Sequence, residues 1–227
     1  MSSLVDLNTT SQAKVWSSLW FKYESENWPL TFPVKCELAL HQRRSFFDDL
    51  GLHSTPNNPI FLEDRYKDCS IFCVRCLQGE DMYTILRASA LRCSTKKEKD
   101  DWLSIVIHLC ALCEKWRFPL IFNEAMCHFA LLQDSPLMVP EHIRIIYQVT
   151  MPGSSLRRLA VDIVMSEDES GTGELRRRAY LEYAGLFKDQ AEFQDALWKK
   201  FQLPLSSLFF GSNFVDARLL KEYHMKV

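Results

Sequence analysis

Cysteine is the residue type in this sequence that most readily suggests chemistry, and there are eight. Cys69, Cys73 and Cys76 form C-x3-C-x2-C, and Cys110 with Cys113 forms C-x2-C, which is numerically enough for zinc. Zinc knuckles need a tight turn between paired cysteines, yet neither C-x2-C pair encloses glycine or proline. The spacing instead places the first three cysteines on one face of a helix, where cysteine packs as a small hydrophobe. We predict buried free thiols without metal, and a zinc-stabilised domain is the alternative.

Nucleophilic catalysis would need a thiol or hydroxyl, a base and a group that orients the base. Cys127 and His128 are the obvious pair, but neighbours on a helix point about 100° apart and do not face each other. His108 and Cys110 fail for the same reason. The sequence contains no G-x-S-x-G, H-E-x-x-H or P-loop motif. We predict that the chain is not an enzyme and has no catalytic residues and no cofactor; a Cys/His enzyme built from distant residues is a less favoured alternative.

Aromatic side chains gather near the start of the chain, between positions 16 and 28. They are Trp16, Trp20, Phe21, Tyr23 and Trp28. One short hairpin cannot bury so many aromatic rings by itself, and aromatic residues are enriched at interface hot spots. Two interpretations are equally open: the rings form an interface, or they cap the core of the rest of the chain.

Two charged segments also have two interpretations. Arg157 and Arg158 either contact an acidic partner segment or pack their stems along a helix, with their heads in water or on a carboxylate such as Asp162. The run from Ser166 to Ser170 contains three acidic residues and is either a docking patch or a solvated helix end. The solvated end is the favoured interpretation of that run.

Composition bounds the class of protein. The 227 residues are 47% hydrophobic and 25% charged, which is ordinary for a globular protein. A formal net charge of -2 creates no global attraction to nucleic acid or anionic lipid, so we predict neither direct nucleic-acid binding nor membrane association. The first residues do not resemble a signal peptide, and no apolar stretch is long enough to cross a bilayer. We expect an intracellular protein, nuclear or cytoplasmic, whose thiols stay reduced.

The first half of the chain shows a mixed pattern. Residues 15–34 predict two strands around a polar turn at Glu24 to Asn27, and apolar spacing predicts a helix over 35–50. A short strand is expected at 60–62, followed by a helix through Leu77 with Asp64 as its N-cap and Gly79 as its stop. Residues 80–94 are ambiguous, with a possible short strand over 83–86.

The second half is helical nearly throughout. Helices are predicted at about 100–115, 119–132, 140–150, 155–167, 173–186 and 189–202. Proline and glycine separate them, and Pro140 suits the first turn of its helix because its missing N–H would be unpaired there.

Four segments resemble the BTB/POZ family, particularly its fungal members. Residues 30–50 (LTFPVKCELALHQRRSFFDDL) are similar to a strand ending in F-x-V-H-K and a helix carrying R-S-x-F-F. Residues 58–80 resemble L-P-E-D…F-E-L-F-V-x-W-L-Y-T-G, and residues 103–119 resemble the family's L-x-x-L-Y-x-L-A-D-K-L-x-I-P helix. Residues 143–165 (IRIIYQVTMPGSSLRRLAVDIVM) are similar to Y-E-N-T-P-x-G-S-P-L-R-R-L-x-V-D and are the most specific match.

Residues 1–13 are polar, which predicts a flexible N-terminal tail. The resemblance implies an α+β fold, with a BTB-like small sheet and helices at 14–118 and a helical extension at 119–227. It implies a scaffold or adaptor that binds protein partners as a homodimer or heterodimer, in transcription, chromatin or a cullin ubiquitin ligase. Lys35, Cys36 and Cys76 depart from the family pattern, which affects the standard dimer and partner surfaces. The interface candidates are Trp16, Trp20, Phe21, Tyr23, Trp28, Arg157 and Arg158.

Overall fold

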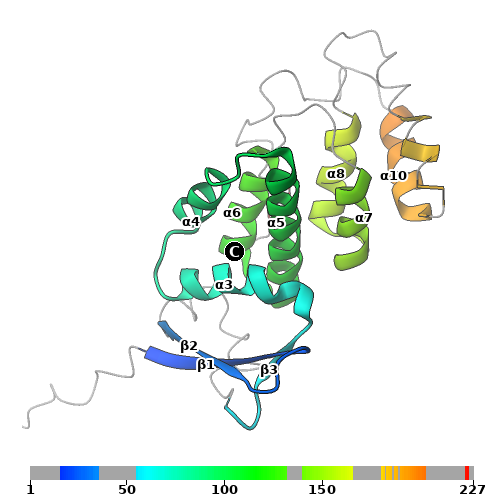
Figure 1. Cartoon of the computed structure of the whole chain (residues 1–227). Helices are drawn as coiled ribbons and strands as arrows, with labels where there is room; N and C mark the ends of the chain where they lie inside the picture. Colours follow the sequence, from blue (N-terminus) through cyan, green and yellow to red (C-terminus); the bar gives the residue numbers. More distant parts are fainter. Residues whose placement is uncertain are drawn as a thin grey trace, which may run out of the picture.

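The fold is mixed α+β, as a computed structural model of the chain shows (Figure 1). The structure describes residues 16–35, 55–131, 140–165, 180–181, 183–185, 187–188, 190–202 and 223–224. Within them, a small sheet lies at one end, α3 crosses over it, and the remaining helices stand above α3. The helix predicted over 35–50 and the acidic run at 166–170 lie outside the described residues.

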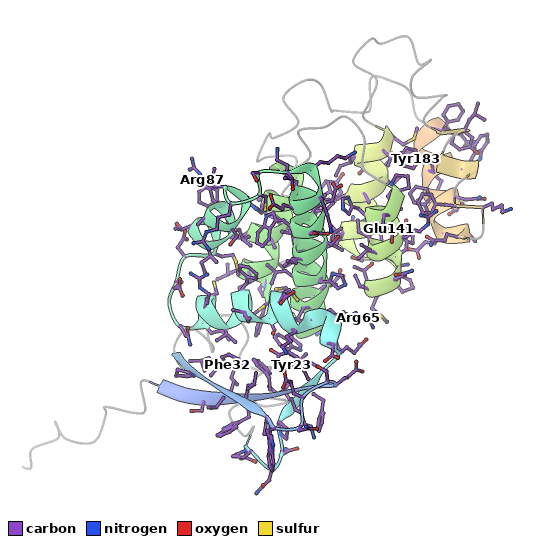
Figure 2. All side chains as sticks on the ribbon, viewed as in Figure 1. Tyr23, Phe32, Arg65, Arg87, Glu141 and Tyr183 are labelled. Carbon is purple, nitrogen blue, oxygen red and sulfur yellow. The ribbon has the colours of Figure 1, made fainter. Side chains whose placement is uncertain are left out.

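The sheet has three strands in the order β2-β1-β3. β1 (Trp16–Tyr23) pairs antiparallel with β2 (Leu30–Lys35), which confirms the predicted hairpin, and β3 (Ile60–Leu62) pairs with β1 in parallel. Side chains alternate along β1, so that Leu19, Phe21 and Tyr23 are buried toward α3. Figure 2 shows Tyr23 and Phe32 in the layer between the sheet and α3.

Asp64 does not cap the first helix, contrary to the sequence prediction. The chain forms a 3-10 turn, η2 (Asp64–Tyr66), before α3 (Lys67–Leu77) begins, and no side chain caps either element. The Asp64 carboxylate instead accepts a hydrogen bond from the backbone N–H of Ser25 at 2.9 Å. The stop at Gly79 is confirmed, because that residue has a φ of 100°, a conformation that glycine adopts without a steric penalty.

Residues 83–86 are helical, so the possible strand there is wrong. α4 (Met82–Ala90) begins after Asp81, whose side chain accepts hydrogen bonds from the N–H and hydroxyl of Thr84 at 2.8 and 2.6 Å. Met82, Ile85 and Leu86 are buried at i, i+3 and i+4, which is one face of a helix. This spacing and the cap outweigh the β-propensity of Tyr83, Thr84 and Ile85.

α5 (Lys96–Trp116) is the central helix and is buried on most of its circumference. It packs against α3, α6 (Pro119–Leu131) and α7 (Pro140–Val149). A capping box starts α5: the Thr95 hydroxyl accepts from the N–H of Glu98, and the Glu98 carboxylate accepts from the N–H of Thr95. These backbone N–H bonds, from Thr95 and then Ser94, lower the pKa of Glu98 to about 2.

α8 (Ser155–Met165) and α10 (Ala191–Gln202) pack against each other, and α7 packs against α5 and α8. The predicted helices at 119–132, 140–150, 155–167 and 189–202 are confirmed to within a few residues, and α7 begins at Pro140 as expected. Of the helix predicted at 173–186, the structure describes 180–181 and 183–185, which are helical. One hydrophobic core runs from Leu19 through Phe118 to Leu197, across the predicted boundary at 118/119.

We predict that replacing Thr95 by alanine lowers the free energy of unfolding by about 1 kcal/mol, because α5 loses its N-cap. Urea denaturation followed by circular dichroism measures the change. Lys97→Ala is the matched control in the same exposed first turn and should change stability by less than about 0.5 kcal/mol. Equal effects of the two variants would show that the capping box does not stabilise the helix.

Candidate functional site

Two of the five aromatic candidates near the start of the chain lie in the core. The ring of Phe21 stacks on Trp116 with their centroids 5.8 Å apart, and it meets Phe32 at 5.6 Å. The hydroxyls of Tyr23 and Ser70 form a buried hydrogen bond of 2.6 Å. Burial is the largest cause of the raised Tyr23 pKa. Both rings therefore serve the interior of this chain, as the capping interpretation expects.

The other face of the sheet points away from the helices (Figure 1), and aromatic side chains on this face and in the adjoining turn are exposed. Phe61 on β3 is 69% exposed and Trp28 in the β1–β2 turn is 80% exposed. Trp20 is half-buried, and the Lys22 ammonium lies 5.7 Å from the centroid of the Phe61 ring. The backbone of Trp16 pairs with Lys35, and its side chain lies outside the described residues. Trp20, Trp28 and Phe61 are called the sheet-end surface below.

The turn that carries Trp28 is held by bonds to the end of β3, to Asp64 and to the start of α3. Glu24 donates its N–H to Leu62 at 3.2 Å, and Ser25 donates its N–H to Asp64. Lys67 on α3 forms an ion pair with Glu26 at 2.5 Å. An exposed ring on an anchored turn loses little conformational freedom on binding, which favours a contact role. Sequence reasoning missed Phe61, because its neighbours Ile60 and Leu62 are equally apolar and only the strand's orientation separates them.

The cysteines form a buried cluster between α3 and α5. Cys69, Cys73, Cys110 and Cys113 are all buried, and the Sγ atoms of Cys73 and Cys113 lie 3.7 Å apart. Burial raises the pKa values of Cys69, Cys110 and Cys113. Thiols of this kind stay protonated at neutral pH, whereas metal ligation and nucleophilic attack use the thiolate. Within the described ranges, no three His, Cys, Asp or Glu side chains are arranged to hold a metal ion.

The adjacent Cys127 and His128 have separate partners. Trp102 donates its indole N–H to Nε2 of His128 at 3.3 Å, and burial lowers the pKa of His128 to about 4. Sγ of Cys127 instead lies 3.4 Å from Nε2 of His224. Burial raises the pKa of Cys127, so this pair does not hold an activated thiolate. His108 likewise faces the carbonyl of Ser104, with Nδ1 at 2.7 Å, and not Cys110.

Arg157 is buried and joins three helices. Its Nε donates to the hydroxyl of Thr150 at 2.9 Å, and its guanidinium donates to the carbonyls of Tyr147 and Thr150 at the end of α7. It also forms an ion pair with Glu192 on α10 and lies over the Tyr147 ring, 4.6 Å from the centroid. This set of contacts is called the Arg157 junction below. Arg157 therefore reaches a carboxylate, but it is Glu192 and not Asp162.

The remaining polar residues of the same segment complete this junction. Gly153 has a φ of 78°, which lets the chain turn between α7 and α8, and its N–H donates to Glu192 at 3.2 Å. Ser154 is buried, and its hydroxyl accepts from the N–H of Leu156 at 3.1 Å at the start of α8. Arg158 behaves differently from its neighbour: it is exposed and donates to the Ser155 hydroxyl at 2.9 Å.

Comparison with protein-family models, curated proteins and solved structures yields no match to the chain. Over the described residues, none of the helices combines the length and apolar character that crossing a membrane requires. Function must therefore be inferred from the chain's own side chains and their geometry.

We predict that Arg157→Lys lowers the free energy of unfolding by about 2 kcal/mol, because an ammonium group cannot reach Thr150, Tyr147 and Glu192 together and leaves buried carbonyls unpaired. Arg158→Lys is the control on the adjacent residue and should change stability by less than about 0.5 kcal/mol. Urea titration of both variants measures the difference. A similar small effect of both substitutions would contradict a joining role for Arg157.

We also predict that iodoacetamide at about pH 8 alkylates Cys93 long before Cys73 or Cys113. Cys93 is only partly buried, whereas Cys73 and Cys113 become accessible only when the core opens. We therefore expect Cys73 and Cys113 to be alkylated at least about a thousandfold more slowly than Cys93. Peptide mapping by mass spectrometry measures each site. Equal rates, or protection that a chelator removes, would contradict packed free thiols and favour a metal site.

Proposed function

We propose that the chain is a non-enzymatic protein-interaction module whose sheet-end surface contacts a second copy or another subunit. The observation that carries this proposal is the exposure of Trp28 and Phe61 on backbone that hydrogen bonds hold in place. Large aromatic side chains contribute strongly to interfaces because they bury much area at a small entropic cost. β2 and β3 are the outer strands of the described sheet, which also favours pairing of strands across a two-fold axis.

A BTB/POZ-like scaffold or adaptor is the specific form that we propose. Where the structure describes them, the segments that resemble the family fall on elements of the matching type. F-x-V lies on β2, residues 58–80 span β3 and α3, and residues 103–119 lie mainly on α5. Residues 143–165 form α7, a turn and α8. These placements support the proposal. By analogy, the module acts inside the cell, in a transcription, chromatin or cullin ubiquitin-ligase complex, without direct contact to nucleic acid.

Binding is favoured over catalysis by the state of the reactive groups. Burial raises the pKa of Cys76 to about 12 and also raises that of Cys127, which keeps both thiols protonated at neutral pH. The pair of Cys127 and His224 is the specific observation in favour of a Cys/His enzyme, the second candidate function. A thiol that a nearby His activates should react with iodoacetamide at neutral pH, and His224→Ala should slow that reaction.

We predict that the purified protein has a light-scattering mass of twice the chain mass at micromolar concentration, and that Trp28→Ser with Phe61→Ser returns it to the chain mass. Both side chains are exposed in the single chain and would be buried in the dimer, so their loss should weaken association by about a hundredfold or more. Leu91→Ser is the control, because Leu91 is 77% exposed and follows α4 rather than the sheet.

Two results would overturn the proposal. One is a protein that is strictly monomeric and purifies without a partner. The other is that Leu91→Ser dissociates the multimer to the same extent as the double substitution. That result would show that loss of any exposed apolar side chain weakens association, wherever it lies.

A further inference from the structure

A cleft lies between α8 and α10, at the end of the molecule away from the sheet (Figure 1). The two helices run in the same direction, because Gly153 meets Glu192 near their starts and Asp162 meets Lys200 near their ends. The cleft has a volume of about 340 Å³. Its polar lining comes from Arg158 and Asp162 on α8, Lys199 and Lys200 on α10, and Tyr223.

The one carboxylate in this lining is neutralised inside the protein. Asp162 is buried, its Oδ1 lies 2.6 Å from the ammonium of Lys200, and its Oδ2 accepts a hydrogen bond from the Tyr223 hydroxyl. A buried carboxylate that is paired in this way does not strongly repel an incoming anion. The charge that the cleft presents to solvent is therefore positive.

Arg158 and Lys199 supply that positive charge from opposite helices. Arg158 is exposed beside Tyr223, with its guanidinium 5.9 Å from the ring centroid, and it forms no ion pair with a carboxylate among the described residues. Lys199 pairs with Asp195 at 2.6 Å, and both side chains are mostly exposed. Exposed pairs one helical turn apart are weak and readily exchange partners. One cationic side chain thus lies on each side of the cleft, Arg158 on α8 and Lys199 on α10.

The cleft also has an apolar component, from Val161 and Ala196. A ligand that uses the whole site combines a carboxylate with a short apolar stem, as a glutamate side chain does. The guanidinium fork matches the two oxygens of a carboxylate. A free inorganic anion would gain nothing from Val161 and Ala196.

We propose that this cleft binds an acidic, glutamate-containing segment of a protein partner. The inference extends the proposed partner-binding function to a second surface. Its failure is distinguishable from failure of the sheet-end proposal, because α8 and α10 lie at the opposite end of the described structure from the sheet (Figure 1). Non-specific attraction is a poor explanation for such binding, because the chain itself has a net charge of -2.

Fluorescence anisotropy of a fluorescein-labelled hexaglutamate peptide, titrated with the full chain at low salt, tests the proposal. We expect hexaglutamate to bind and hexaglutamine not to bind. Arg158→Gln should weaken binding by about tenfold, and Lys199→Gln should weaken it by about threefold. Arg87→Gln is the matched control, since Arg87 is an exposed arginine beside a tyrosine on α4, and it should change affinity by less than about twofold.

Absence of hexaglutamate binding overturns the proposal, as does an equal loss in Arg87→Gln, which would indicate a general charge effect. Inorganic phosphate serves as the competitor. A peptide site is supported if phosphate displaces hexaglutamate only at concentrations at which sodium chloride also displaces it. Binding of phosphate more tightly than the peptide overturns the assignment to a peptide. Circular dichroism confirms folding of each variant, and Lys199→Gln carries the test if Arg158→Gln proves unstable.

Discussion

Burial of the central helix α5 determines how the helices around it are arranged. From Trp102 to Trp116, its buried residues occupy most of the circumference of the helix. A helix that is apolar on most sides must be enclosed, because each exposed apolar face costs free energy in water. α3, α6 and α7 contact α5 and provide this cover, and the sheet lies beyond α3. The remaining elements pack on this first layer: α4 contacts α6, α8 contacts α7, and α10 contacts α8.

The cysteine cluster is a consequence of this enclosure. Helices that pack closely need small side chains where their surfaces meet. Cys73 on α3 and Cys113 on α5 are fully buried and meet with their sulfur atoms 3.7 Å apart, so both thiols act as small packing groups where the helices meet. The spacing that suggests zinc in the sequence thus arises from the periodicity of two packed helices. The same burial that makes the thiols good packing groups raises their pKa values and suppresses their chemistry.

Much of the fold could be predicted from the sequence, because local patterns determine it. The hairpin, the start of α7 at Pro140 and the limits of α8 follow from periodicity, turn residues and proline. Residues 83–86 were harder, because β-branched and aromatic side chains favour a strand over so short a window, while the deciding cap at Asp81 lies outside it. At these residues, burial of apolar side chains at helical spacing outweighs the local preference for a strand.

The candidate site could be predicted only in part, because exposure depends on contacts between distant segments. Phe21 and Trp28 are equally apolar in the sequence, yet one stacks on Trp116 and the other is 80% exposed. The partner of Cys127 is His224, 97 residues away, and no local spacing could identify it. Arg157 and Arg158 present the same problem in its sharpest form, since adjacent arginines on one helix have opposite environments.

The difference between these two arginines links stability to recognition. Arg157 on α8 holds Glu192 on α10, and the cleft that Arg158 lines lies between the same two helices. Because α8 turns by about 100° per residue, one arginine can point toward the α7–α10 contact while the next points toward solvent. The two helices that form the cleft walls are thus joined by a buried guanidinium before a ligand arrives. Preorganisation of this kind lowers the entropic cost of binding, so the residue that stabilises the helical half also determines how well its surface can bind.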